Sequence, residues 1–374
     1  MTTDAPLRST RAVAGPGTTW SPVAGGGEHP GGAGLMRVEP VPGCPACAGS
    51  GPVAYSGLVD GLYASAGRWE LRRCARCATL WLDPQPVAED IHLAYRRYHT
   101  HGGSTGASAP RGARRLLALL RSAYVDERYG YATTHVPAPA RKVLSLPVRG
   151  WPGQRAEADV AVALTPAGRS VTMLDVGCGD GGFVAFAGSL GWDASGIDPD
   201  PAAVAAARRR GVRADVGTLE DQGYPAGTFD LIVMNHVIEH VHEPLRLLRE
   251  CRRILTAGGR VLITTPNAGS ALHLRYREHW RGLEPPRHLR IYSVAGMATT
   301  LQNAGLTTGL LVTTVRGAAY AVAGSRSLRR GGPPDGPLGR ARERAVAESL
   351  QAALAIRLRH DAGAGQEILA VATA

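Results

Sequence analysis

Lysine is almost absent from this chain of 374 residues: Lys142 is the only one, and the other 41 of the 42 basic residues are arginines. In a background rich in Ala and Gly, this bias is typical of a GC-rich genome, which raises Arg without selecting for phosphate. The net charge of +11 is therefore weak support for nucleic-acid binding. Residues 171–260 carry twelve acidic residues against nine arginines, so the excess positive charge lies elsewhere.

Long apolar runs are absent as well. No window of 18 apolar residues occurs, so no transmembrane helix is expected. Residues 1–20 lack the apolar segment of a secretory signal peptide, which predicts a cytoplasmic protein. Thiols stay reduced in that compartment, so the six cysteines are predicted to be metal ligands or buried apolar groups in preference to disulfide partners.

Composition divides the chain into five parts. Residues 1–40 contain thirteen Gly and Pro residues and no apolar periodicity, which predicts disorder. Prolines and glycines also punctuate residues 133–170, which indicates a linker. The predicted parts are a disordered tail (1–40), a cysteine-rich module (41–100), a helix and linker (101–165), a core (166–316), and an insertion, a helix and the final strand of the core sheet (317–374).

In the core, apolar runs of strand length alternate with helical segments. The runs are VTMLDV, ASGI, FDLIVM and RVLITT, and EILAVAT at 367–373 is predicted to be a last strand returning to the sheet. This alternation predicts an α/β fold, a Rossmann-like parallel sheet with helices on both faces.

A glycine-rich turn joins the first core strand to its helix. Gly177, Gly179 and Gly182 satisfy G-x-G-x-x-G, the fingerprint of dinucleotide binding, so an NAD-dependent dehydrogenase is one alternative. However, Asp175 at the end of the strand would repel a diphosphate and favour a cationic ligand. Asp198 ends the next strand, 21 residues after Gly177, where a carboxylate can bind two ribose hydroxyls.

Together with FDLIVMNHVIEHV and AGGRVLITTPN, these residues resemble the class I S-adenosylmethionine (SAM)-dependent methyltransferases. The resemblance covers 166–316 and implies a seven-stranded sheet with a reversed last strand. It implies that Asp198 holds the ribose and that Asn235 and His236 face the sulfur of the cofactor. It assigns the methionine moiety to Asp175, Gly177, Gly179 and Gly181, and the adenine to Thr218 and Leu219.

Two C-x2-C pairs stand 26 residues apart in the module, and they comprise Cys44, Cys47, Cys74 and Cys77. Four thiolates in this pattern match a structural zinc site, so a zinc-ribbon-like module is predicted, with metal binding coupled to its folding. Arg72, Arg73 and Arg76 leave open a nucleic-acid-binding ribbon or an RNA methyltransferase. RCARCATLWLDPQP also resembles the N-terminal part of bacterial small-molecule and sugar methyltransferases.

Histidine is the expected general base, because it can accept a proton near neutral pH. His236 and His240 flank the turn after the fourth strand, and His288 lies in HWRGLEPPRHLRIYS; His288 is preferred. His236, Glu239 and His240 share one face of a helical turn, so an active-site metal stays an alternative. The prediction is methyl transfer to an O or C atom of a small molecule, with neither nucleic acid nor membrane as partner.

Overall fold

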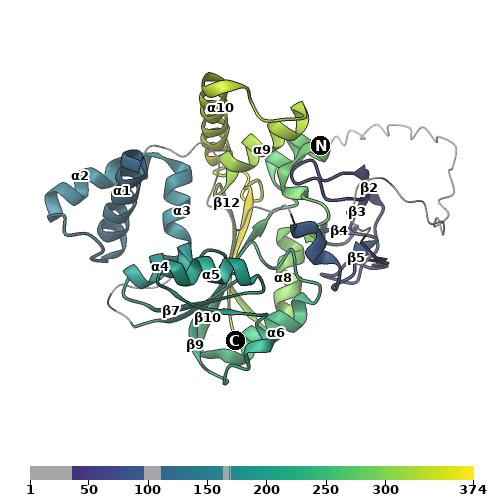
Figure 1. Cartoon of the computed structure of the whole chain (residues 1–374), viewed down its shortest axis with the longest axis horizontal. Coiled ribbons are helices and arrows are strands. Elements are labelled where there is room, and N and C mark those ends of the chain that lie inside the picture. Colours follow the sequence, from purple (N-terminus) through teal and green to yellow (C-terminus); the bar gives the residue numbers. More distant parts are fainter. Residues whose placement is uncertain (1–35, 97–110, 163–167, 169) are drawn as a thin grey trace, which may run out of the picture. The chain divides into compact units, whose positions relative to one another are not determined.

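The computed structural model describes residues 36–96, 111–162, 168 and 170–374 (Figure 1). Most of the predicted tail, residues 1–35, lies outside this part. Among the described residues, no helix combines the length and the apolar character that crossing a bilayer requires.

A seven-stranded sheet forms the centre of the fold, in the order β12-β13-β10-β9-β6-β7-β8. Strands β6 to β10 pair in parallel, whereas β13 runs antiparallel to both β10 and β12. The predicted seven-stranded sheet with a reversed last strand is thus confirmed. Its strands are β6 (Thr172–Val176), β7 (Asp193–Asp198), β8 (Arg213–Val216), β9 (Phe229–Asn235), β10 (Leu255–Pro266), β12 (Thr307–Thr314) and β13 (Glu367–Thr373).

Helices cover both faces of this sheet, because successive strand residues point to opposite sides. Leu174 packs in a cluster with α6 (Pro244–Ile254) and α8 (Val294–Asn303). Met173 belongs to a different cluster, with residues of α4 (Gly182–Ser189). α5 (Pro201–Arg209) packs beside β7 and β8. The termini are set by local signals: Pro244 occupies the first turn of α6, and the Ser293 hydroxyl accepts a hydrogen bond from Gly296 N at 2.9 Å.

The predicted linker is instead helical. After α1 (Arg111–Tyr129), the chain forms α2 (Ala138–Gly150) and α3 (Pro152–Val162). Tyr124 of α1 and Val148 of α2 are buried in the same cluster as Met173, so these helices help to cover the second face of the sheet. The prolines of this stretch do not mark breaks: Pro137 and Pro152 stand at helix starts, where a missing N–H costs nothing, and Pro147 lies inside α2.

The cysteine-rich module carries a four-stranded antiparallel sheet in the order β11-β4-β3-β2. Strand β11 (Arg290–Ile291) belongs to the connection after β10 and pairs with β4 (Leu80–Leu82). The module sheet therefore crosses the predicted boundary between module and core. The other strands are β2 (Val53–Leu58) and β3 (Trp69–Arg73), and β1 (Val38–Glu39) pairs separately with β5 (Gln85–Pro86).

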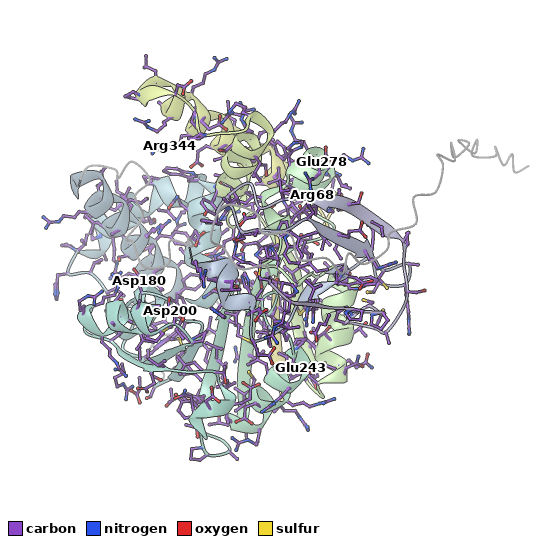
Figure 2. All side chains as sticks on the ribbon, turned by 45° about the vertical axis from the view of Figure 1, so that its right-hand side comes forward. Arg68, Asp180, Asp200, Glu243, Glu278 and Arg344 are labelled. Atoms are coloured by element: carbon purple, nitrogen blue, oxygen red, sulfur yellow. The ribbon has the colours of Figure 1, made fainter. Side chains whose placement is uncertain are left out.

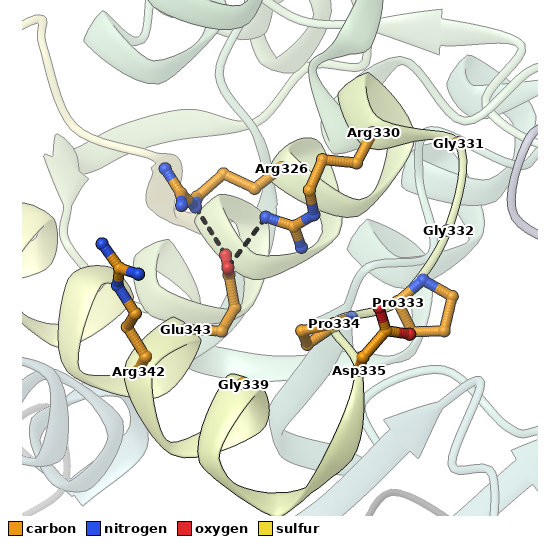
Figure 3. Close-up of a pocket in the computed structure, with 10 residues that line it drawn as sticks. All are labelled: Arg326, Arg330, Gly331, Gly332, Pro333, Pro334, Asp335, Gly339, Arg342 and Glu343. Atoms are coloured by element: carbon orange, nitrogen blue, oxygen red, sulfur yellow. Dashed lines mark hydrogen bonds and ion pairs between the residues drawn. The ribbon is translucent and has the colours of Figure 1, made fainter.

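Two helices stand between β12 and β13, namely α9 (Ala318–Arg330) and α10 (Gly336–Arg357). Glu343 of α10 accepts hydrogen bonds from Arg326 and Arg330 of α9, at 2.6 and 2.9 Å (Figure 3). These pairs hold the insertion together and neutralise part of its arginine charge. The shorter elements are η1 (Ile91–Tyr95), η2 (Glu220–Gln222), α7 (Ala271–Tyr276), η3 (Arg277–His279) and η4 (Arg281–Leu283).

Candidate functional site

The glycine-rich turn follows β6 at the carboxyl edge of the sheet. Gly177 and Cys178 both donate their N–H to the carbonyl of Ile197 in β7, at 2.8 and 2.9 Å. Gly177 has a φ of +72°, and a Cβ there would lie 2.6 Å from Cγ2 of Val237. Glycine is required by both the backbone conformation and this contact, which joins the turn to the segment after β9.

Two carboxylates, of which Asp175 is only 3% exposed, flank the turn. Asp198 Oδ2 accepts from Gly179 N and Oδ1 from Asp200 N, both at 2.9 Å, so Asp198 fixes the turn directly. Burial and the neighbouring Asp198 charge raise the pKa of Asp175 to about 8. At pH 7 Asp175 is therefore mostly protonated in the free protein. Asp180, which pairs with Arg210, and Asp200 are further acidic side chains near the turn (Figure 2).

The other residues assigned to the cofactor follow neighbouring strands at the same edge. Thr218 is exposed after β8 and donates from N and Oγ1 to Asp221 Oδ2, at 2.9 and 2.7 Å. Leu219 is buried in the core. Asn235 ends β9, and its Oδ1 accepts from Thr264 Oγ1 at 3.0 Å.

His236 is held between two carboxylates. Its Nδ1 lies 3.0 Å from Glu239 Oε1 and its Nε2 lies 2.9 Å from Glu367 Oε1. Burial opposes the positive charge, but the two glutamates outweigh it and raise the pKa of His236 to about 10. With both ring nitrogens donating, His236 has no lone pair with which to accept a proton. We therefore do not assign it the role of general base.

His240 and His288 differ from His236 because each places Nδ1 against a backbone carbonyl. His240 Nδ1 lies 3.0 Å from Arg287 O, and His288 Nδ1 lies 2.8 Å from Gly282 O. A carbonyl only accepts, so Nδ1 carries the proton and a neutral ring leaves Nε2 free to accept one. Burial and the neighbouring His240 lower the pKa of His288 to about 4, so this ring is neutral at pH 7.

The two imidazoles meet edge to face, with ring centroids 4.7 Å apart. Glu239, His240 and His288 place ligand-type atoms within 4.8 Å of one another, which is the residue set of a cation site. Both oxygens of Glu239 are already used, however: Oε1 by His236 and Oε2 by Thr265 Oγ1 at 2.9 Å. These hydrogen bonds hold Glu239 in place but leave each oxygen a second acceptor position, so the active-site metal stays an alternative.

A cavity of about 400 Å³, here called the polar pocket, contains all three predicted histidines. Charged side chains that the sequence did not single out also line it. They are Glu157, Arg281, Glu284, Arg316 and Glu367. One of them was detectable: Glu367 starts the reversed strand β13, and a reversed strand starts at the edge where its parallel neighbours end.

The four module cysteines converge. Sγ of Cys44 lies 3.6 Å from Sγ of Cys77, and Cys47 lies 3.5 Å from Cys74; all four sulfurs are within 4.8 Å of one another. Zinc–sulfur bonds of about 2.3 Å in a tetrahedron place sulfurs about 3.8 Å apart, so the cluster has the size that zinc requires.

The two C-x2-C turns of the cluster, one with Cys44 and Cys47 and the other with Cys74 and Cys77, have the same backbone geometry. Cys44 N donates to Gly49 O at 2.8 Å, and Cys74 N donates to Thr79 O at 2.9 Å. Close in sequence to the second C-x2-C turn, Arg72 donates a hydrogen bond to Asp83 Oδ2 at 2.6 Å. This ion pair neutralises one of the three arginines on which the nucleic-acid alternative rested.

A family described as a methyltransferase domain matches residues 150–309. A ubiquinone biosynthesis O-methyltransferase of Xanthomonas axonopodis is 35% identical over 160 residues, 39% of this chain and 66% of the relative. A probable SAM-dependent methyltransferase of Mycolicibacterium smegmatis is 37% identical over 103 residues, 27% of this chain and 39% of the relative. A solved SAM-dependent methyltransferase from Mesorhizobium loti is 18% identical, with a TM-score of 0.40 over 58% of this chain and 97% of that one.

This chain thus spans between 39% and 66% of the length of these two curated relatives. The matched domain contains the glycine-rich turn, Asp198 and the segment around His236 and His240. Residues 150–309 thus carry a methyltransferase domain, and the seven-stranded sheet has the topology that the resemblance to class I SAM-dependent methyltransferases implies.

Proposed function

We propose that this chain transfers a methyl group from SAM to an oxygen or carbon atom of a small polar molecule, by in-line displacement. The observation that carries the proposal is the acidic glycine-rich turn, whose Gly177 lies close to Val237, the residue that follows the pocket-lining His236. SAM supplies an already activated methyl group, so the protein mainly has to align donor and acceptor, an effect worth up to about 7–11 kcal/mol.

The acidic turn suits a cationic cofactor. A positive ligand beside Asp175 would stabilise its ionised form and lower the pKa that burial has raised. Asp198 is held by two backbone N–H groups and would accept hydrogen bonds from the ribose hydroxyls. The remaining proposed cofactor contacts are Gly177, Gly179, Gly181, Thr218, Leu219 and Asn235.

Proton removal is assigned to His288 and His240. Both keep Nε2 available in the polar pocket, and the low pKa of His288 keeps that ring neutral at physiological pH. A positioned base contributes roughly 100- to 10,000-fold in rate when its pKa lies near the working pH. The low pKa of His288 therefore keeps its ring neutral but also limits its strength as a base in the free protein.

The charges in the polar pocket balance. Arg316 contacts both Glu157 and Glu367 at 3.1 Å, and Arg281 lies 3.5 Å from Glu284. His236, the third cation, also contacts Glu367. The pocket therefore favours a neutral acceptor that makes hydrogen bonds, such as a hydroxyl-rich sugar, over an apolar one.

The four cysteines are proposed to hold a structural zinc ion. A fully sulfur-ligated site has no open position, so it would support folding rather than catalysis. The proposal places the protein in the cytoplasm, where reduced thiols are available as ligands.

A labelled-methyl assay tests the function. The full chain and methyl-labelled SAM are incubated with uncharged hydroxyl-rich sugars, apolar quinols and RNA in parallel. Transfer to a hydroxyl-rich small molecule, lost in His288→Gln, is the expected result. Transfer to RNA alone would establish the RNA methyltransferase alternative, and transfer to quinols alone would refute the reasoning from the pocket charges.

A further inference from the structure

A buried ion pair joins the cysteine-rich module to the connection that carries His288. The Arg287 side chain is fully buried, and it donates from Nη1 to Asp60 Oδ2 at 2.8 Å and from Nη2 to Asp60 Oδ1 at 3.0 Å. Its Nε donates to Glu284 Oε1 at 3.0 Å. A two-point contact of this kind fixes direction as well as distance, so the placement of Arg287 depends on Asp60.

Asp60 is itself held firmly in the loop after β2. Its carboxylate accepts from the backbone N–H groups of Leu62, Tyr63 and Ser65, at 3.0 to 3.1 Å. Burial opposes its ionisation, but Arg287 and these N–H groups outweigh burial and lower the pKa of Asp60 to about 2. The module therefore presents a fixed negative charge to Arg287.

Arg287 holds His240 in position in two ways, directly and through the segment that carries Tyr95. Its carbonyl oxygen lies 3.0 Å from His240 Nδ1. Its Nη1 also donates to Ala94 O at 3.0 Å, and the next residue, Tyr95, places its hydroxyl 2.9 Å from the same His240 nitrogen.

His288 is held by the same segment. Its backbone N donates to Glu284 O at 3.2 Å, and Glu284 is the residue that the Arg287 Nε binds. Leu289 N donates to Glu239 O at 2.9 Å, which ties the segment back to the turn that carries His240.

We propose that Asp60 and Arg287 are positioning residues, which hold the imidazoles of His240 and His288 in the geometry required to take a proton from the acceptor. The inference rests on the proposed function, because it assigns the module a part in catalysis without contact with either substrate. It also gives a physical reason for the module sheet to include β11.

The test compares Asp60→Asn with Asp126→Asn in the full chain. Asp126 is also buried, accepts hydrogen bonds from Thr133 and Thr134, and lies in the last turn of α1. Imidazole ¹⁵N resonances, assigned with His240→Gln and His288→Gln, report the protonation and hydrogen bonding of both rings. Titration with S-adenosylhomocysteine, which needs no acceptor, reports the cofactor site.

Asp60→Asn is expected to shift the His240 and His288 resonances and to raise the pKa of His288 from about 4 toward 6.5, because the relaxed segment admits water. Asp126→Asn should shift neither, and S-adenosylhomocysteine affinity should change less than twofold in both. Ser65→Ala, which removes one Arg287 contact, is a milder variant with a smaller shift in the same direction. Unchanged imidazoles with intact cofactor binding would overturn the positioning role alone, whereas wild-type protein that binds no S-adenosylhomocysteine would overturn the proposed function.

Discussion

Replacing Glu239 by Gln tests the interpretation that His236 is positively charged and links Glu239 to Glu367. The Glu239 side chain is 0% exposed and accepts from His236 Nδ1 and Thr265 Oγ1. Gln keeps the shape but loses the charge, and its amide nitrogen would face groups that donate. His236 would retain only Glu367 as a charged partner.

The expected loss of stability is about 3 kcal/mol. The His236 charge outweighs the burial of Glu239 and lowers its pKa from an ordinary 4.5 to about 2, which corresponds to about 3 kcal/mol in favour of the folded, ionised state. Removing one partner of a buried ion pair costs about 3–5 kcal/mol, and the surviving Glu367 contact favours the lower end.

The assay is urea unfolding of wild type and Glu239→Gln from pH 3 to pH 10. The lowered pKa of Glu239 means that its contribution is present above pH 4.5 and is lost toward pH 2. The raised pKa of His236 means that its contribution is complete below pH 6.5 and is lost as pH rises toward 10. The difference between the two proteins should therefore be greatest between pH 4.5 and 6.5.

Glu250→Gln is the matched control. Glu250 also pairs at a spacing of three residues, with Arg253 at 2.6 Å, but the Arg253 side chain is 45% exposed. Its loss should cost at most about 1 kcal/mol. If the difference in the free energy of unfolding between wild type and Glu239→Gln stays constant across the whole pH range, the positive charge on His236 is refuted. A neutral His236 would give that result.

Two further predictions concern the metal and the glycine-rich turn. Metal analysis should find one zinc ion per chain in the wild type and none in Cys74→Ser. Cys251 is buried in the core away from the cluster, so Cys251→Ala should retain the zinc. A zinc-free wild type would contradict the proposed zinc site. Gly181→Ala should destabilise the fold by about 1–3 kcal/mol in urea unfolding, because φ is +73° and the new Cβ would lie 2.6 Å from Val212 Cγ2. Gly188→Ala in α4, with nothing within 4 Å, should instead stabilise it by about 0.5–1 kcal/mol, and equal effects would contradict this reasoning.

Local patterns in the sequence were sufficient to predict the core sheet. Alternating strands and helices and the glycine-rich turn are short-range signals, and the topology confirms the sheet that they predict. The strand at 367–373 was also predicted locally, but its reversed direction followed from the resemblance to the family. The two C-x2-C pairs likewise predicted a cluster that the structure brings together. In both cases neighbouring residues determine the local geometry, so the sequence carries the information directly.

Long-range contacts were beyond such patterns. The partner of His236 is Glu367, 131 positions away, and the partner of Asp60 is Arg287, 227 positions away. No local periodicity marks these pairs, so the sequence suggested His236 as a base where the fold makes it a doubly bonded cation. The α2 and α3 helices were missed for a different reason, because prolines were taken as breaks where Pro137 and Pro152 begin helices.

Calorimetric titration of the full chain with S-adenosylhomocysteine and with NAD tests the central claim most directly. The acidic turn and Asp198 predict that S-adenosylhomocysteine binds one per chain, that Asp198→Ala abolishes this binding, and that NAD does not bind. Binding of NAD in the absence of any S-adenosylhomocysteine signal would contradict the account.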